Sequence, residues 1–236
     1  MNIKEYIKSA KNKIAILIDP DDFWESDEKQ SEMLSVLKGF PPAIVLVGGS
    51  LLSDDTFHDT IDILKSNVNV PVVIFPGDSS QISSKADAIL HLSLISGRNP
   101  EFLIGQQVRS AFKIHKSGIE VISTGYILIG ESETSVAYMS NTTPIPSNKT
   151  DIVLATALAG VHMGSDALYL EAGSGAVKEI DSNLIRKVVA VNQGITIVGG
   201  GIKDGATAKV MLDAGADLIV IGNGFAKRPN LLKEVL

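Results

Sequence analysis

The chain has 236 residues, 44% of them hydrophobic and 20% charged, which is enough apolar material for one domain over residues 1–236. Its net charge of −6, with the basic residues scattered, argues against a nucleic-acid partner, and the absence of cysteine excludes disulfides and thiolate chemistry. No signal peptide and no run of roughly eighteen apolar residues is visible. We therefore expect a cytoplasmic protein with no transmembrane segment, for which a transient contact with a membrane surface stays open.

Eight short apolar runs recur along the chain. They are residues 14–18, 43–47, 71–75, 88–94, 120–122, 167–170, 195–198 and 218–221. Near-continuous apolarity, rather than alternation, is typical of parallel strands buried on both faces. Apolar residues at helical spacing lie between the runs, in 31–37, 56–64, 100–115, 182–191 and 203–214. Strand and helix in alternation predict an α/β fold, a modified TIM (β/α)8 barrel.

Three segments depart from this rhythm. Residues 76–85 are short, polar and rich in serine, so we expect the third helix to be reduced or replaced by a loop. Residues 124–150 are a long insertion after the fifth strand, where long segments usually serve a site or a subunit contact. Residues 152–159 are apolar on nearly every face, which predicts a helix covered by a partner. We therefore expect a homo-oligomer, with a dimer and a hexamer as the candidates.

Glycine-bearing segments follow the last three apolar runs. They read Tyr169-Leu170-Glu171-Ala172-Gly173-Ser174-Gly175, Gly199-Gly200-Gly201-Ile202 and Gly222-Asn223-Gly224. A strand that ends in glycine and turns into a helix presents backbone N–H groups at the positive end of that helix, which is an anion site. Three such turns at adjacent strand ends predict a phosphate bound by the last strands of the barrel.

Acidic and hydroxyl side chains follow the first, second and sixth runs. Asp19 begins an Asp-Pro-Asp-Asp turn and Ser50 follows two glycines, and both offer the oxygen ligands that Mg²⁺ prefers. The alternative interpretation of Asp19 is ordinary turn chemistry. Glu171 is a candidate base for a substrate hydroxyl, and Tyr169 is a candidate for orienting that substrate. The alternatives are a structural carboxylate and an ordinary core aromatic residue.

Together these segments resemble the geranylgeranylglyceryl phosphate synthase family, including its bacterial heptaprenylglyceryl phosphate relatives. Besides the three glycine segments, the matching motifs are Leu17-Ile18-Asp19-Pro20-Asp21, Val47-Gly48-Gly49-Ser50, Ser96-Gly97-Arg98-Asn99-Pro100, Thr124-Gly125-Tyr126 and Tyr138-Met139-Ser140-Asn141. The resemblance spans nearly the whole chain. It implies a Mg²⁺-dependent prenyltransferase that joins sn-glycerol 1-phosphate to a long-chain prenyl diphosphate (geranylgeranyl or longer) through an ether and releases diphosphate.

The resemblance also implies roles for individual residues. Asp19 and Ser50 would bind the Mg²⁺ that takes up the diphosphate, and Glu171 would be the base near the attacking hydroxyl. The residues that would hold the glycerol phosphate are Tyr169, Leu170, Glu171, Ala172, Gly173, Ser174, Gly175, Gly200, Gly201, Gly222 and Asn223. The prenyl tail needs an apolar groove, for which the third to fifth strands, Phe102, Leu103 and Tyr126 are the candidates.

One position departs from the family pattern. The family usually has a lysine two residues after the proline of the Asp-Pro pair, where this chain has Asp22. Three interpretations stay open: the lysine is dispensable, another residue such as Arg98 compensates, or diphosphate binds less tightly. Two other functions also fit the glycine turns. One is another phosphate-binding barrel enzyme of the sugar-phosphate isomerase type, and the other is a non-catalytic phosphate-binding oligomer.

Overall fold

The computed structural model describes the chain except for residues 54, 131–133, 174–175 and 177. Parallel strands pair in sequence order and the last closes onto the first, which makes a barrel. The strands are β1 (Ile14–Ile18), β2 (Ile44–Val47), β3 (Val72–Ile74), β4 (Ala88–Leu94), β5 (Glu120–Leu128), β6 (Ala167–Glu171), β7 (Ile195–Gly199) and β8 (Leu218–Ile221). Each predicted run overlaps one of these strands, so the predicted barrel is confirmed.

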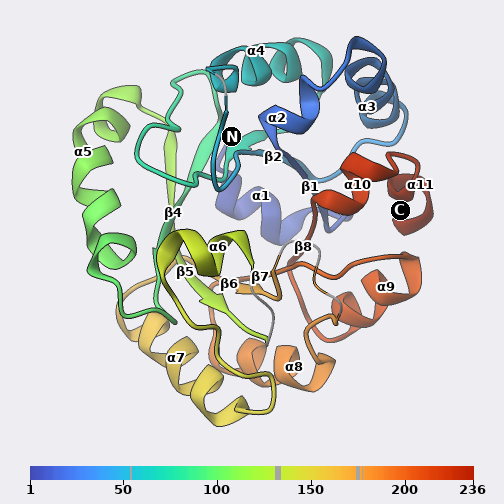
Figure 1. The fold of residues 1–236 in the computed structure, drawn as a ribbon. Helices are drawn as coiled ribbons and strands as arrows, with labels where there is room; N and C mark the ends of the chain where they lie inside the picture. Colours follow the sequence, from blue (N-terminus) through green and yellow to red (C-terminus); the bar gives the residue numbers. More distant parts are fainter. Residues whose placement is uncertain (54, 131–133, 174–175, 177) are drawn as a thin grey trace.

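Helices surround the barrel in Figure 1. They are α1 (Ile3–Ser9), α2 (Pro20–Phe23), α3 (Asp27–Gly39), α4 (Phe57–Asn67), the π-helix η1 (Glu101–Gly105), α5 (Gln106–Ser117), α6 (Ser135–Ser140), α7 (Thr150–His162), α8 (Ser182–Val191), α9 (Gly205–Asp213), α10 (Asn223–Lys227) and α11 (Leu231–Val235). Side-chain caps fix several starts; Ser26, for example, accepts the N–H of Lys29 at the start of α3. Turns and loops occupy residues 75–87, between β3 and β4, so the expected loss of the third helix is confirmed.

Side-chain alternation along the strands separates two apolar layers. One layer fills the barrel interior and includes Leu90, Tyr126 and Tyr169. The other lies between the strands and the helices and includes Ile89 and Leu170. We call these the interior core and the outer core. The division decides which residues of a strand can reach a site at the barrel mouth.

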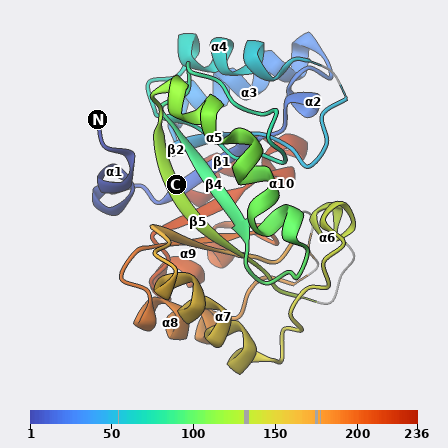
Figure 2. The same ribbon diagram turned by 90° about the vertical axis from the view of Figure 1, so that its left-hand side faces the viewer.

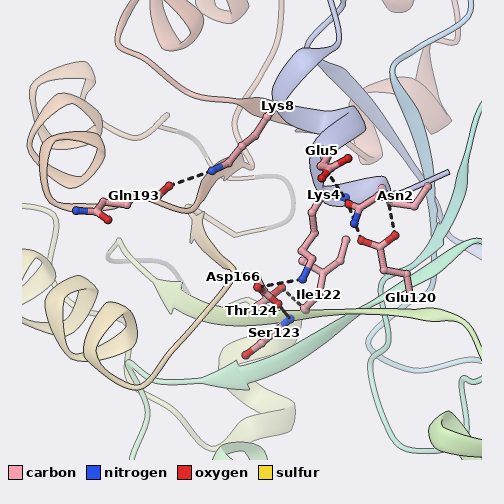
Figure 3. Close-up of polar contacts among 11 residues, drawn as sticks. Asn2, Lys4, Glu5, Lys8, Glu120, Ile122, Ser123, Thr124, Asp166 and Gln193 are labelled. Atoms are coloured by element: carbon pink, nitrogen blue, oxygen red, sulfur yellow. Dashed lines mark hydrogen bonds and ion pairs between the residues drawn. The ribbon is translucent and has the colours of Figure 1, made fainter.

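Helix α1 closes the amino end of the barrel. Its Ile3 and Ile7 are buried in the interior core. The backbone N–H groups of Ile3 and Lys4 donate to the Glu120 carboxylate, at 2.6 and 3.1 Å. The ammonium of Lys4 lies 3.2 Å from a carboxylate oxygen of Asp166, as Figure 3 shows. The interior is therefore approached from the carboxyl ends of the strands.

The segment predicted as an insertion after the fifth strand is partly strand. Strand β5 continues to Leu128, and Ile129 then forms a parallel bridge with Ile145 beyond α6. In α7, Val153 and Ala157 face the barrel, whereas Ile152 is 46% exposed. The apolar helix thus has one face buried within the chain and an outer apolar face. In the part of the chain that the structure describes, every helix is too short or too polar to cross a membrane.

Candidate active site

A cavity of about 370 Å³ opens at the carboxyl ends of the strands. One part of it is lined by side chains of the interior core, including Tyr126 and Tyr169. A second part lies beyond the barrel wall, between β4, α5 and the loop that replaces the third helix. This part, which we call the outer arm, is lined by Ile82, Ile89, His91, Gln107, Ser110 and Ile114. The cavity therefore joins the barrel mouth to a space outside the barrel.

Glu171 ends β6 inside the cavity and is only 7% exposed. Its Oε1 accepts the backbone N–H of Gly173 at 2.6 Å. Burial raises the pKa of this carboxyl from 4.5 to about 7, even though hydrogen bonds from the Gly173 N–H and from the Tyr169 and Tyr126 hydroxyls lower it. A carboxylate with this pKa can accept a proton near neutral pH, which is the requirement for a general base.

Three aromatic rings stack beside Glu171. The Tyr126 and Tyr169 rings, which are paired in register on β5 and β6, have centroids 5.1 Å apart at 25°. Phe75, just after β3, stacks on Tyr169 at 5.3 Å. Burial, followed by the charge of Glu171, raises the pKa of both tyrosines well above its usual value. Both hydroxyls therefore stay protonated and serve as hydrogen-bond donors.

The glycine turns after β7 and β8 lie in the wall beside Glu171. Gly200 and Gly201 have φ values of +80° and +73°, in the left-handed region that favours glycine. A Cβ on Gly200 would lie 2.6 Å from Oε1 of Glu171, so only glycine lets this turn approach the carboxylate. Gly222 caps the start of α10 and lines the cavity with Asn223. The first N–H groups of α10 lack intrahelical partners, and the loop after β7 lies against α10, where a Cβ on Gly224 would be 3.4 Å from the Ile202 carbonyl oxygen. We call Gly200, Gly201, Gly222 and Asn223 the anion site, as the candidate for holding a phosphate.

Asp19 follows β1, the strand that pairs with β8 in the barrel, and lines the same mouth. It caps α2, and its Oδ1 accepts the N–H of Asp21 at 3.1 Å. Burial first, and then the charges of Asp21 and Asp22, outweigh that hydrogen bond and raise the pKa of Asp19 from 3.8 to about 6. A Cβ on Gly49 would lie 2.6 Å from Oδ2 of Asp19, so glycine keeps this oxygen accessible beside Ser50. The half-buried carboxylate is thus surrounded by negative charge.

Asp22 also lines the cavity, and Lys29 from α3 lies beside it. The Lys29 ammonium is 3.4 Å from Oδ1 of Asp22. Arg98, by contrast, is absent from the cavity wall, and its guanidinium donates to the Gly97 carbonyl at 2.6 Å. Compensation by Arg98 is therefore not supported, and Lys29 is the cation that accompanies Asp22.

The cavity brings together most of the predicted site residues. Those in its wall are Asp19, Ser50, Tyr169, Glu171, Gly200, Gly201, Gly222 and Asn223. Leu170, Ala172 and Gly173 do not line it. Because Tyr169 and Glu171 point into the barrel, the side chain of Leu170 between them points into the outer core, so a substrate contact of this residue would have to use its backbone. Ser174 and Gly175 lie outside the described residues.

In the part of the chain that the structure describes, two polar side chains of the outer arm have a buried atom without a hydrogen-bond partner, and the sequence analysis did not single them out. Among the described residues, Nε2 of His91 and Oε1 of Gln107 are buried without a hydrogen-bond partner. Burial lowers the pKa of His91, which favours the neutral imidazole. The signal in the sequence was a single histidine within the apolar run 88–94. Nothing in the run showed that this residue faces a cavity rather than a helix.

A parallel barrel with an anion site, a buried base and an acidic site at one mouth is a phosphate-handling TIM-barrel enzyme. Its family follows from comparison with known proteins. The chain belongs to the PcrB family, whose model matches residues 7–236.

Named relatives and a solved structure agree with this family. The geranylgeranylglyceryl phosphate synthase of Chitinophaga pinensis is 46% identical over 222 residues, covering 94% of this chain and 87% of that protein. The protein of the same name from Pyrococcus horikoshii is 39% identical over 233 residues, 97% of this chain and 91% of that one. The crystal structure of (S)-3-O-geranylgeranylglyceryl phosphate synthase from Thermoplasma acidophilum, in complex with its substrate sn-glycerol-1-phosphate, matches with a TM-score of 0.90. It is 30% identical, and the match covers 100% of this chain and 96% of that chain.

Proposed function

We propose that this chain is a prenyltransferase that joins sn-glycerol 1-phosphate to a prenyl diphosphate, forming an ether and releasing diphosphate. The observation that carries the proposal is the buried Glu171, with a pKa of about 7, in direct contact with the Gly200 turn of the anion site. A phosphate in that site would place an alcohol of the same small molecule near the carboxylate. The names of the relatives and the ligand of the Thermoplasma structure support this substrate.

The glycerol phosphate binds through backbone donors. Each favourable helix-end contact contributes roughly 0.3–1 kcal/mol, so the two turns of the anion site act together. Lys203 and Lys227 also line this part of the cavity and add positive charge. Glu171 then accepts the proton of the attacking hydroxyl, while the tyrosine hydroxyls hold its carboxylate in place. Holding the two reactants side by side supplies much of the rate enhancement.

Mg²⁺ is the cofactor that we propose for the acidic side of the mouth. The donors fit it, because Mg²⁺ usually takes one or two protein oxygens and completes its shell with water and substrate phosphate. Asp19 would hold the ion together with Ser50, and the charges of Asp21 and Asp22 favour a cation there. Among the described residues there is no larger cluster of metal-binding side chains, in keeping with a shell completed by substrate. When bound, Mg²⁺ neutralises charge on the leaving diphosphate.

The outer arm is the proposed site of the prenyl tail. Its buried isoleucines, Ile82, Ile89 and Ile114, offer apolar surface close to the mouth. Each methylene buried there contributes about 0.8 kcal/mol. The expected groove along the third to fifth strands thus corresponds to a space outside the barrel, reached where the third helix is missing.

Copies of the chain are proposed to associate through the outer face of α7. Exposed apolar residues follow one another there at helical spacing: Ile152, Ala155, Ala159 and Met163. Covering such a face is favourable in water. Light scattering after size exclusion tests this, and a monomer at high protein concentration rejects it. We propose a cytoplasmic location for the assembly.

The reaction is tested by incubating the protein with Mg²⁺, labelled sn-glycerol 1-phosphate and a pool of prenyl diphosphates of different lengths. We expect a lipid-extractable, acid-stable ether whose mass identifies the chain used. sn-Glycerol 3-phosphate serves as the matched control substrate. Absence of an ether from every chain length refutes the proposed function.

A further inference from the structure

The outer face of the η1–α5 segment carries an exposed apolar row. Ile104 lies in the π-helical turn, and Val108 and Phe112 follow at four-residue intervals in α5, so the three share one face. They are 59%, 65% and 79% exposed, respectively. In Figure 2 the helix lies on the side of the molecule that faces the viewer. An apolar row on a solvent-facing helix indicates a surface that another body covers.

The same helix is basic in an acidic protein. Residues Gln106–Ser117 include Arg109, Lys113 and Lys116 and contain no aspartate or glutamate, whereas the whole chain has a net charge of −6. Arg109 is paired with Glu101 of η1, so Lys113 and Lys116 carry the net positive charge of the η1–α5 segment. An amphipathic helix with aromatic and aliphatic residues on its outer face and cations beside them is typical of helices that lie in a membrane interface. Cations at such a position are attracted to anionic lipid headgroups.

The inner face of α5 lines the outer arm of the cavity. Gln107, Ser110 and Ile114 contribute to the wall of the arm, on the side opposite the exposed row. One helix therefore separates the proposed prenyl site from solvent. Whatever surface covers the exposed row lies within one helix diameter, roughly 10 Å, of a bound prenyl tail.

We propose that the η1–α5 segment docks on an anionic membrane surface, with Ile104, Val108 and Phe112 inserted among the lipids and the neighbouring cations at the headgroups. The inference rests on the proposed function, because docking helps the reaction only if the substrate and the product are lipids, as a long prenyl diphosphate and its ether product are. Docking brings the outer arm next to the phase in which both molecules reside. A soluble enzyme then exchanges them without carrying the tail through water.

Charge distinguishes the bilayer from a second copy of the chain as the occupant. Lys113 follows Phe112 directly and Lys116 lies one turn beyond it, so a two-fold contact through the row would bring the net positive charge of one segment towards that of the other. Like charges in a contact disfavour association. An anionic bilayer complements both the row and its cations.

Flotation of the full-length protein with vesicles tests the proposal, using phosphatidylcholine alone and phosphatidylcholine mixed with phosphatidylglycerol. We expect binding to the anionic vesicles and loss of binding at high salt. Phe112→Asp and Val108→Asp should each lower the partition coefficient about tenfold, since an apolar side chain is replaced by a charge that lipid headgroups repel. Val210→Asp, at a residue 52% exposed on α9, is the matched control and should bind like the parent.

Three results would overturn the proposal. One is a parent protein that does not float with anionic vesicles. Another is a Phe112→Asp variant that floats as well as the parent. The third is a change from oligomer to monomer in that variant with vesicle binding unchanged, which would make the row a subunit interface. Ether synthesis from a short, water-soluble prenyl diphosphate should be the same in the parent and in Phe112→Asp. Absence of an ether from this substrate and from every longer prenyl diphosphate, in both proteins, would refute the proposed function instead.

Discussion

Replacing Glu171 by glutamine tests the central chemical assignment. The amide keeps an oxygen for the Gly173 N–H, which the carboxylate accepts at 2.6 Å, but it cannot take up a proton. A positioned general base contributes about 10²–10⁴-fold to rate, so kcat should fall within that range. Binding of sn-glycerol 1-phosphate, measured by calorimetry, should change by less than about tenfold, because the anion site binds phosphate through backbone N–H groups.

The pH dependence separates this role from a structural one. Because the base acts only when unprotonated, kcat/KM of the parent should rise about tenfold per pH unit up to its pKa of about 7 and then level off. In the glutamine variant, kcat/KM should not show this rise with pH. Initial rates with labelled sn-glycerol 1-phosphate between pH 5 and pH 9 measure both profiles. A residual activity near that of the parent, or a variant that keeps this rise, would refute the assignment of Glu171 as the base.

The free energy of unfolding of the parent should fall over the pH range in which kcat/KM rises. Burial raises the pKa of Glu171 from 4.5 to about 7, so the folded chain binds its proton more tightly than the unfolded chain. The folded state therefore loses stability as the pH rises from 4.5 to 7, by roughly 3 kcal/mol in all. Glutamine carries no such penalty, and urea unfolding at pH 8 should find Glu171→Gln at least as stable as the parent. Glu28→Gln, on the exposed side of α3, is the control and should alter neither rate nor stability.

Three further substitutions test the anion site, the proposed metal site and the closed end of the barrel. Gly200→Ala should lower kcat at least about tenfold and destabilise the fold by about 1–2 kcal/mol, because the added Cβ meets the Glu171 carboxylate and the φ of residue 200 is +80°. The control is Gly39→Ala, which has open space around it and should change neither kcat nor the melting temperature. Asp19→Asn should raise the Mg²⁺ concentration for half-maximal rate about tenfold or more and leave sn-glycerol 1-phosphate binding intact, and an unchanged Mg²⁺ titration would contradict the proposed metal site. Glu120→Ala should lower the free energy of unfolding by about 1–3 kcal/mol, because two N–H groups of α1 lose their acceptor; an unchanged urea midpoint would show that α1 docks without it.

Most of the fold could be predicted because most of the barrel strands are buried on both faces and so form unbroken apolar runs. The absence of the third helix could also be predicted, because residues 76–85 offer no apolar face that could pack against the barrel. The predicted end of the fifth strand was wrong: the apolar run stops at Ile122, but β5 continues through Thr124 and Gly125 to Leu128. Pairing with β4 and β6 holds that stretch extended, and such pairing cannot be derived from local composition.

The sequence motifs predicted which residues belong to the candidate site, but only in part how those residues are arranged in space. The family is confirmed, whereas the metal, the oligomer and the membrane contact stay predictions. A sequence motif includes Leu170 and Glu171 without distinguishing their directions, although strand alternation puts Leu170 in the outer core and Glu171 in the cavity. The outer arm could not be found from sequence, because it is a space between β4, α5 and a loop. His91 acquires its meaning only once that space exists.

The helix that closes the amino end of the barrel also bears on how the chain is made. Ile3 bonds to a residue 117 positions later and Lys4 to one 162 positions later, so α1 is synthesised long before its partners. At a synthesis rate of about 5–20 residues per second, the wait for Asp166 is roughly 8–30 seconds. The pairing of Ile14 with Ile219 comes later still. The ring and its floor are therefore completed only after β8 has been made, and until then the apolar side chains of α1 and β1 lack their final partners.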